Sequence, residues 1–155
     1  MNVLESFSLK GKVALVTGGA GLYGRQIVEA LAEAGAETYI ASRNLDSLQQ
    51  VAKEEVERGY NVTAMKLDLS EDESIENLHH DIIDKSGKCD ILINNAVSRE
   101  FGSAGWKNTL DDFDKSLRVN ASALFKITEM FAEDMKKNSS GSIINIGSMM
   151  GTVGV

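Results

Sequence analysis

A glycine-rich turn is the first stretch of this sequence whose residue types could do chemistry. In VALVTGGAGLYGRQIVEAL, Gly18, Gly19 and Gly24 stand between a β-branched run and an amphipathic segment of helical length. Such a turn lets the backbone approach a ligand closely, and the helix that follows presents N–H groups and the positive end of its dipole. This arrangement favours binding of the diphosphate of a dinucleotide. A tight turn from strand to helix, with no ligand, is the plainer alternative.

The residues after the second β-branched run, ASRN, bear on which dinucleotide would bind. A NAD-binding domain commonly has Asp or Glu about twenty residues beyond the glycine loop, where it accepts hydrogen bonds from the ribose hydroxyls. This sequence has Arg43 there instead, between Ser42 and Asn44. A guanidinium can hold a 2′-phosphate through two parallel hydrogen bonds. The sequence therefore predicts NADP as the cofactor and leaves NAD open; a solvated loop arginine is the alternative for Arg43.

The remaining candidate residues do not form a catalytic or metal-binding set. His79 and His80 are adjacent on a predicted helix, so they point in different directions and make a poor metal pair. Cys89 comes just before a strand with no histidine near it in the sequence, which favours a reduced structural thiol. Trp106 either lines a pocket mouth or anchors its loop. No metal site is predicted.

Five short runs rich in β-branched residues are the elements that would position the glycine turn and Arg43. They are apolar almost throughout rather than alternating, which is typical of parallel strands covered on both faces. The predicted strands are Lys12–Thr17, Glu37–Ser42, Val62–Asp68, Asp90–Asn95 and Ser142–Ile146.

Four amphipathic stretches of helical length separate these strands. The third opens with SEDE, where Ser70 and Glu73 are predicted to form a capping box. Glycines follow the first three stretches, as expected at helix C-termini. The helices are expected at Arg25–Ala34, at Leu45–Arg58, from Ser70 onward and at Thr109–Met135, and the glycines are Gly35, Gly59 and Gly87. Residues expected on their apolar faces include Val28, Val51, Val56, Ile75, Ile82, Phe113, Leu117 and Phe125.

The alternation of strand and helix predicts an α/β fold. Right-handed crossovers and one reversal of direction give a Rossmann-like, doubly wound parallel sheet with strand order 3-2-1-4-5. Residues 1–155 contain no repeat, no low-complexity linker and no proline, and are interpreted as a single domain.

The amino-acid composition indicates which classes of partner and which cellular compartment to expect. The 155 residues carry a net charge of −7, and no cluster of Lys and Arg is visible, so we expect no nucleic-acid partner. The amino-terminal stretch has no apolar segment typical of a signal peptide, and no run is long enough to cross a membrane. The single cysteine suits a reducing compartment. A cytoplasmic protein with no membrane partner is expected.

Five separated motifs give the chain a resemblance to the short-chain dehydrogenase/reductase family. TGGAGLYG resembles the family's TGxxxGxG, and NNA resembles its NNAG element after the fourth strand. LDLS places Asp68 where the family holds the adenine ring, and RVNASALF supplies Asn120 inside the fourth helix. INIGS brings Ser148 to the position of the family's active-site serine. The motifs occur in the family's order and on the expected elements along the whole chain.

The resemblance implies roles for individual residues. Ser148 and Asn120 would be catalytic: Ser148 would hydrogen-bond the substrate oxygen, and Asn120 would hold a water. A loop hydroxyl and a helix-interior polar group bonded to backbone are the alternatives. The cofactor-binding residues would be Thr17, Gly18, Gly19, Leu22, Tyr23, Gly24, Ser42, Arg43, Asn44, Asp68, Leu69, Asn94, Asn95, Ala96 and Asn120.

The sequence also departs from the family pattern. Leu22 replaces the middle glycine of the first motif, and Val97 replaces the glycine of NNAG. The family's Tyr-x-x-x-Lys pair is missing, because none of the tyrosines at 23, 39 and 60 is followed four places later by lysine. The fold is therefore expected to lack the family's last strands and helices, and activity of these residues alone stays open.

The resemblance thus implies the cofactor-binding N-terminal part of an NADP-dependent oxidoreductase. The reaction would be hydride transfer between NADP(H) and a small-molecule alcohol or carbonyl substrate, a sugar or polyol being one option. The full-length form would be a homo-oligomer. A non-catalytic dinucleotide-binding module and an inert truncated fragment are the alternatives, and substrate identity and reaction direction stay open.

Overall fold

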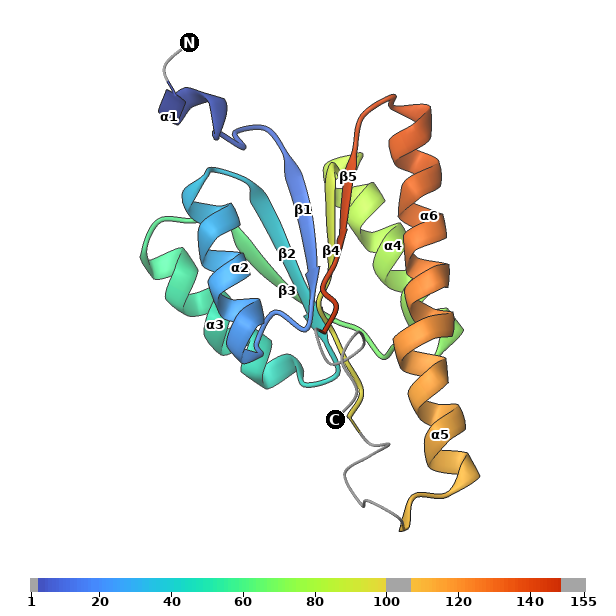
Figure 1. The fold of residues 1–155 in the computed structure, drawn as a ribbon. Helices are drawn as coiled ribbons and strands as arrows, with labels where there is room; N and C mark the ends of the chain where they lie inside the picture. Colours follow the sequence, from blue (N-terminus) through green and yellow to red (C-terminus); the bar gives the residue numbers. More distant parts are fainter. Residues whose placement is uncertain (1–2, 100–106, 149–155) are drawn as a thin grey trace.

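A five-stranded parallel sheet, in the order β3-β2-β1-β4-β5, forms the centre of the computed structural model, which describes residues 3–99 and 107–148 (Figure 1). The predicted sheet and its strand order are confirmed. The strands are β1 (Val13–Thr17), β2 (Glu37–Ser42), β3 (Val62–Lys66), β4 (Ile91–Asn94) and β5 (Ser142–Asn145). The helices are α1 (Val3–Ser6), α2 (Leu22–Glu33), α3 (Leu45–Glu57), α4 (Asp72–Ser86), α5 (Leu110–Leu117), the π-helical η2 (Arg118–Ala123) and α6 (Leu124–Lys137).

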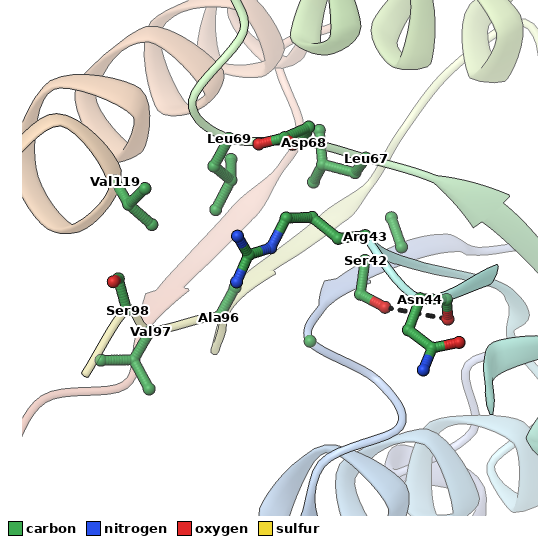
Figure 2. A pocket seen from close by; sticks show the side chains of 12 residues that line it. Ser42, Arg43, Asn44, Leu67, Asp68, Leu69, Ala96, Val97, Ser98 and Val119 are labelled. Atoms are coloured by element: carbon green, nitrogen blue, oxygen red, sulfur yellow. Dashed lines mark hydrogen bonds between the residues drawn. The ribbon is translucent and has the colours of Figure 1, made fainter. Parts of the chain in front are cut away.

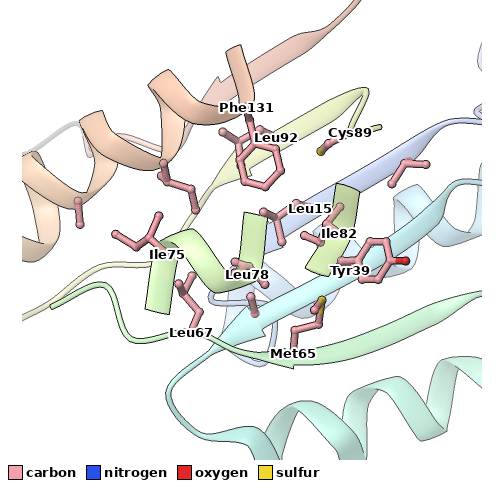
Figure 3. Close-up of a cluster of buried hydrophobic side chains, with 14 of the residues drawn as sticks. Leu15, Tyr39, Met65, Leu67, Ile75, Leu78, Ile82, Cys89, Leu92 and Phe131 are labelled. Carbon is pink, nitrogen blue, oxygen red and sulfur yellow. The ribbon is translucent and has the colours of Figure 1, made fainter. Parts of the chain in front are cut away.

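The helices cover the sheet from both sides. In Figure 1, α2 and α3 lie against one face, whereas α4 and α6 lie against the other. Every residue of β1 is buried, as the unbroken apolar run predicts for a central strand. Adjacent side chains of β1 belong to separate hydrophobic clusters on the two faces of the sheet. Leu15 packs with α4 and α6, and Val16 packs with α2 and α3. Figure 3 shows the first of these clusters, in which Phe131 from α6 and Ile82 from α4 lie over the same face of the sheet.

Several helix ends follow their sequence signals. Gly35, Gly59 and Gly87 all have positive φ angles just beyond α2, α3 and α4, where a side chain would strain the backbone. At the start of α5, Thr109 and Asp112 form a capping box in which each side chain accepts a hydrogen bond from the other's backbone N–H.

The capping box predicted at Ser70 is wrong. Helix α4 begins at Asp72, and its N-cap residue Glu71 provides no side-chain cap. The Ser70 hydroxyl instead donates to the Asp68 carboxylate at 2.6 Å, and the Ser70 amide donates to the same oxygen at 2.9 Å. Hydrogen bonds to a charged carboxylate are stronger than those to neutral acceptors, so Ser70 bonds to Asp68 and the two residues form the turn before α4.

The predicted long fourth helix is one continuous rod with a π-helical turn in it. The turn comprises Arg118–Ala123 and includes Asn120. Phe113, Leu117 and Phe125, which were expected on the apolar face, are 40%, 45% and 67% exposed. Figure 1 gives the reason for the first two, since α5 extends beyond the end of the sheet and has no strand beneath it.

Two other expected packing positions are also corrected. Val56 is 55% exposed, because the buried stripe of α3 passes through Leu48, Val51 and Ala52. Strand β5 has three exposed residues out of four, since it is the edge strand of the described sheet, paired with β4 on one side and packed against α6. The short helix α1 was not predicted.

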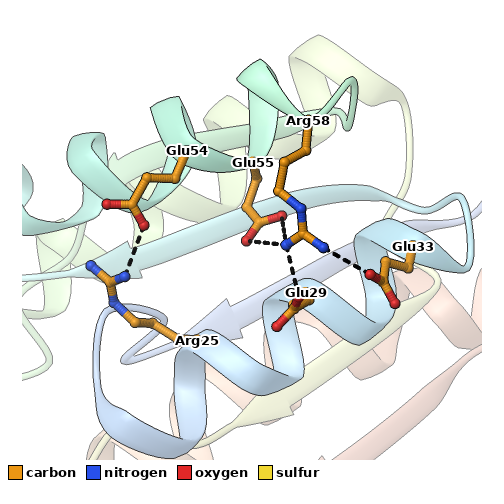
Figure 4. A network of polar contacts seen from close by, with 6 residues as sticks. All are labelled: Arg25, Glu29, Glu33, Glu54, Glu55 and Arg58. Atoms are coloured by element: carbon orange, nitrogen blue, oxygen red, sulfur yellow. Dashed lines mark hydrogen bonds and ion pairs between the residues drawn. The ribbon is translucent and has the colours of Figure 1, made fainter.

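A network of ion pairs joins the outer faces of α2 and α3 (Figure 4). The Arg58 guanidinium contacts Glu29 and Glu33, each at 2.8 Å, and Glu55 at 3.1 Å. Nearer the amino end of α2, Arg25 pairs with Glu54 at 2.9 Å. The network ties the helix that follows the glycine loop to its neighbour and so helps to fix the direction of α2.

We predict that Phe131→Ala lowers the free energy of unfolding by about 3–5 kcal/mol, because the ring is fully buried and its removal leaves a cavity. Phe125→Ala removes the same ring from an exposed site on the same helix and should change stability by no more than about 0.5 kcal/mol. Urea denaturation of both variants measures the difference. Equal losses would contradict the placement of α6.

Candidate dinucleotide-binding site

A crevice lies at the carboxyl ends of the strands, where the loops after β1, β2, β3 and β4 converge. In open parallel sheets, ligands bind where successive crossovers leave the sheet in opposite directions, here between β1 and β4. Two adjoining hollows occupy this crevice. We call them the Arg43 pocket, of about 280 Å³, and the glycine-loop pocket, of about 410 Å³. They share Gly18, Ser42, Ala96 and Val97 as lining residues.

Side chains do not fit at three positions of the glycine loop, Gly18, Gly19 and Gly24. Gly18 has a φ of +71°, and a Cβ atom there would come within 3.0 Å of the Ala96 Cα. A Cβ atom on Gly24 would collide with the Gly18 carbonyl oxygen. Helix α2 starts at Leu22, and its N-cap residue Gly21 supplies no side-chain cap. The loop therefore brings bare backbone and the positive end of α2 to the crevice, which suits an anionic ligand.

Thr17 and Asn95 fasten the end of β1 to the end of β4. The Thr17 Oγ1 accepts hydrogen bonds from the backbone N–H groups of Asn95 and Ala96, both at 3.0 Å. The Asn95 Nδ2 donates in return to the carbonyl oxygens of Thr17 and Gly18 at 3.1 Å. Both side chains thus shape the loops around the crevice by binding the protein's own backbone.

Arg43 and Asp68 face the Arg43 pocket from the ends of β2 and β3. Figure 2 shows the Arg43 side chain extended across the pocket, between Leu69 and Ala96. The pKa of Asp68 is lowered mainly by the hydrogen bond from the Ser70 hydroxyl; partial burial opposes this, and the Ser70 amide and the Arg43 charge add to it. The carboxylate is therefore ionised at neutral pH and can accept a hydrogen bond from a ligand N–H group.

Asn44, by contrast, uses its side chain as a helix cap. Its Oδ1 accepts a hydrogen bond from the Ser47 amide at 3.1 Å at the start of α3. The Ser42 hydroxyl donates to the Asn44 carbonyl oxygen at 3.4 Å (Figure 2). These two residues line the Arg43 pocket while they fix the turn that carries Arg43.

Asn120 positions the loop after β4. Its Oδ1 accepts from the Ser98 amide and its Nδ2 donates to the Ser98 carbonyl oxygen, both at 2.8 Å. The Nδ2 also donates to the Ser116 hydroxyl at 3.1 Å. The π-helical turn places this amide opposite Ser98, and such turns are frequent at functional sites. The Asn120 side chain is therefore bonded to the backbone of a distant segment of the chain.

Ser148 follows β5 by three residues and is exposed. The Ile146 amide donates to the Asn94 carbonyl oxygen at 2.9 Å, so the chain leaves β5 beside the end of β4. Ser148 thus belongs to the same edge of the sheet as the crevice. Trp106 and residues 149–155 lie outside the described part of the chain.

The structure brings most of the predicted site residues to the two pockets. Gly19 is not among the lining residues, because it packs under Ile40, where a Cβ atom would approach to 2.8 Å. Asn94 is also turned away: its Nδ2 donates to Thr128 at 3.0 Å and to Asn145 at 2.9 Å. The predicted residues that line a pocket are Gly18, Leu22, Tyr23, Gly24, Ser42, Arg43, Asn44, Asp68, Leu69, Asn95 and Ala96.

Sequence reasoning missed several lining residues. Ser98 and Arg99 belong to the loop after β4, and Val119 lies on η2 beside Asn120. Their position in the sequence could have indicated them, since they lie within three residues of the motif residues Ala96 and Asn120. Ala20 and Gly21 complete the glycine loop.

The other candidate residues have structural roles. Cys89 is buried, and burial raises the pKa of its thiol to about 12. His79 bonds to Asp134 at 2.6 Å, whereas His80 pairs with Asp84 at 3.2 Å, so the two imidazoles do point apart. Within residues 3–99 and 107–148, no group of three or more His, Cys, Asp or Glu side chains could hold a metal ion. No helix of that part is long and apolar enough to cross a membrane.

The parallel sheet, the glycine loop and the crevice between β1 and β4 define a Rossmann-like fold of the dinucleotide-binding kind. The chain belongs to the short-chain dehydrogenase family, whose model, described as short chain dehydrogenase, matches residues 12–155. This membership makes it part of an oxidoreductase family.

Relatives match nearly all of this chain in sequence, and the solved ones also match it in fold. An uncharacterized oxidoreductase of Thermotoga maritima is 35% identical over 142 residues, which are 90% of this chain and 54% of that protein. A metagenomic short-chain oxidoreductase in complex with NADP is 31% identical, with a TM-score of 0.88 over 95% of this chain and 66% of that one. A 7α-hydroxysteroid dehydrogenase complexed with NADH and 7-oxo glycochenodeoxycholic acid is 28% identical, with a TM-score of 0.90 over 100% and 60%. The chain spans about half the length of the curated relatives it matches.

We predict that Thr17→Val lowers the free energy of unfolding by about 1–3 kcal/mol, because it leaves two backbone N–H groups without their acceptor. Thr17→Ser keeps the hydroxyl and should cost much less. Chemical denaturation compares the two variants. A valine variant as stable as the serine variant would show that the hydroxyl does not hold the loop after β4.

The lowered pKa of Asp68 predicts a pH dependence of stability. A depressed carboxyl pKa stabilises the fold above the unfolded-state value of about 3.9, and this contribution disappears as the pH falls through the lower folded-state value. Asp68→Asn should therefore lose less stability than the wild type when thermal unfolding is followed from about pH 5 down to about pH 2. Parallel losses in both proteins would contradict the prediction.

Proposed function

We propose that this chain supplies the cofactor-binding part of an NADP-dependent oxidoreductase that transfers hydride between NADP(H) and an alcohol or carbonyl substrate. The observation that carries the proposal is Arg43, which extends from the end of β2 across the pocket where a dinucleotide-binding domain holds the adenosine ribose. No acidic side chain stands at that strand end to accept from the two ribose hydroxyls of NAD.

The residues of the crevice fit the successive parts of such a cofactor. The glycine loop and the amino end of α2 would bind the diphosphate, and the Arg43 guanidinium would bind the 2′-phosphate. The ionised Asp68 would accept a hydrogen bond from the adenine amino group. Leu69 and Ala96 line the Arg43 pocket and would contact the adenosine. Leu22 and Tyr23 reach the other pocket and would flank the diphosphate. Ser42 and Asn44 would fix the turn carrying Arg43.

The nicotinamide, when bound, would give or take the hydride, and the described residues would orient the substrate and the loops around it. Ser148 would donate a hydrogen bond to the substrate oxygen from the edge of the sheet. Asn120 would act on the reaction through Ser98, by holding the loop after β4 in place. Thr17, Gly19, Asn94 and Asn95 would support the cofactor through the backbone that they position.

The comparisons support a nicotinamide dinucleotide as the cofactor, and the preference for NADP rests on Arg43. Solved relatives of similar fold bind NADP in one case and NADH in another. We propose residues 1–155 as one dinucleotide-binding unit of a cytoplasmic enzyme that acts on a small molecule, such as a sugar or polyol, and that forms a homo-oligomer at full length. The chain spans about half the length of its curated relatives, so the activity of the whole protein is part of this proposal.

Titration with NADPH and NADH tests the proposal, with thermal stabilisation as the readout. We predict that Arg43→Asp weakens NADPH binding about tenfold or more, since it replaces two charge-assisted hydrogen bonds by repulsion, and weakens NADH binding far less. Arg43→Lys keeps the positive charge but lacks the planar guanidinium, so its affinity for NADPH should lie between those of the wild type and Arg43→Asp. Equal changes for both cofactors would refute the role of Arg43, and a wild-type protein that binds neither would refute the proposed function.

A further inference from the structure

In the part of the chain that the structure describes, Arg99 is the charged side chain that lines the glycine-loop pocket. Among the described residues that line this pocket, the others are small, polar and uncharged, or apolar. Leu22, Tyr23 and Val97 stand around it with 80%, 68% and 57% of their surfaces exposed. Among these lining residues, Arg99 is therefore the side chain whose charge can attract an anion.

Arg99 differs from the other arginines in having no partner in the part of the chain that the structure describes. Arg25 pairs with Glu54, Arg58 with three glutamates, and Arg118 with Asp72 at 2.6 Å. Arg43 also has contacts within the protein. The sequence contains 23 acidic residues against 16 basic ones, so carboxylates for pairing are plentiful. A guanidinium left unpaired in such a protein, and lining a pocket, is available to an anionic ligand.

The backbone at Arg99 is also fixed in advance. The preceding residue, Ser98, has both its N–H and its carbonyl group bonded to the Asn120 side chain at 2.8 Å. Arg99 therefore projects from an anchored point, and binding a ligand costs less ordering than it would from a free loop. The amino end of α2, whose N-cap residue Gly21 supplies no side-chain cap, lines the same pocket and adds a second positive potential.

We propose that Arg99 binds an anionic oxygen group, a phosphoryl or a carboxylate, of a ligand in the glycine-loop pocket, and that the site therefore selects anionic ligands. This inference rests on the proposed function, because it places the ligand in the same crevice. Two sources share the chemistry: the diphosphate of the dinucleotide, and a carboxylate on the substrate.

The experiment uses the protein encoded by the complete gene, as wild type and as Arg99→Gln, Arg99→Lys and Lys53→Gln. Lys53 is 70% exposed on α3 away from the crevice, so its variant controls for the loss of one positive charge. In the first arm, calorimetry measures binding of inorganic pyrophosphate and of NADPH. In the second, with NADPH saturating, it measures binding of D-gluconate and of D-glucitol, which differ in having a carboxylate or a neutral hydroxymethyl group.

We predict that Arg99→Gln weakens the anionic probe of one arm about tenfold, or about 1.4 kcal/mol, relative to Lys53→Gln. Arg99→Lys should recover part of the loss. A change in the pyrophosphate arm identifies the diphosphate, and a change for gluconate but not for glucitol identifies a substrate carboxylate.

Equal affinities of Arg99→Gln and Lys53→Gln in both arms overturn the proposal. An unchanged affinity for pyrophosphate combined with equal changes for gluconate and glucitol also overturns it, because neither anionic group would then depend on Arg99. Failure of the proposed function has a different signature, since it requires that the wild type bind neither NADPH nor NADH.

Discussion

The close approach of α2 to the glycine loop is the constraint on which the rest of the site depends. A Cβ atom at Gly24 has no room because the Gly18 carbonyl group occupies its place, and Gly18 itself lies against Ala96 on the loop after β4. These contacts set the amino end of α2 directly over the junction of β1 and β4. Backbone dipoles can then face a ligand at short range, with no side chain between them.

Mutual hydrogen bonding of loops turns that junction into a fixed crevice. Thr17 holds the amides that follow β4, Asn95 returns hydrogen bonds to the glycine loop, and Asn120 binds Ser98 from a separate helix. Each of these side chains satisfies backbone groups that regular secondary structure leaves unpaired. The crevice is therefore a rigid feature of the sheet ends, and its lining residues start from set positions when a ligand arrives.

The crevice is lined by positive charge, whereas the protein as a whole is negatively charged. The chain carries a net charge of −7, yet Arg43 and Arg99 line the two pockets and the positive end of α2 adds to them. Asp68 lies at the rim with a lowered pKa, so it is an ionised acceptor within cationic surroundings. An acidic exterior with a cationic crevice favours a multiply charged small ligand over an extended polyanion.

The sequence by itself determined the order of strands and helices and the position of the glycine loop, because periodicity and backbone freedom are local properties of the chain. It placed α3 from Leu45 almost to the residue. Only the tertiary structure decided which partner each polar group takes. Ser70 bonds to Asp68 instead of capping a helix, and the Asn94 side chain donates to Thr128 on α6. A π-helical turn places Asn120 where its side chain bonds to Ser98. Hydrogen-bond partners depend on which distant segments meet, and no local pattern encodes that.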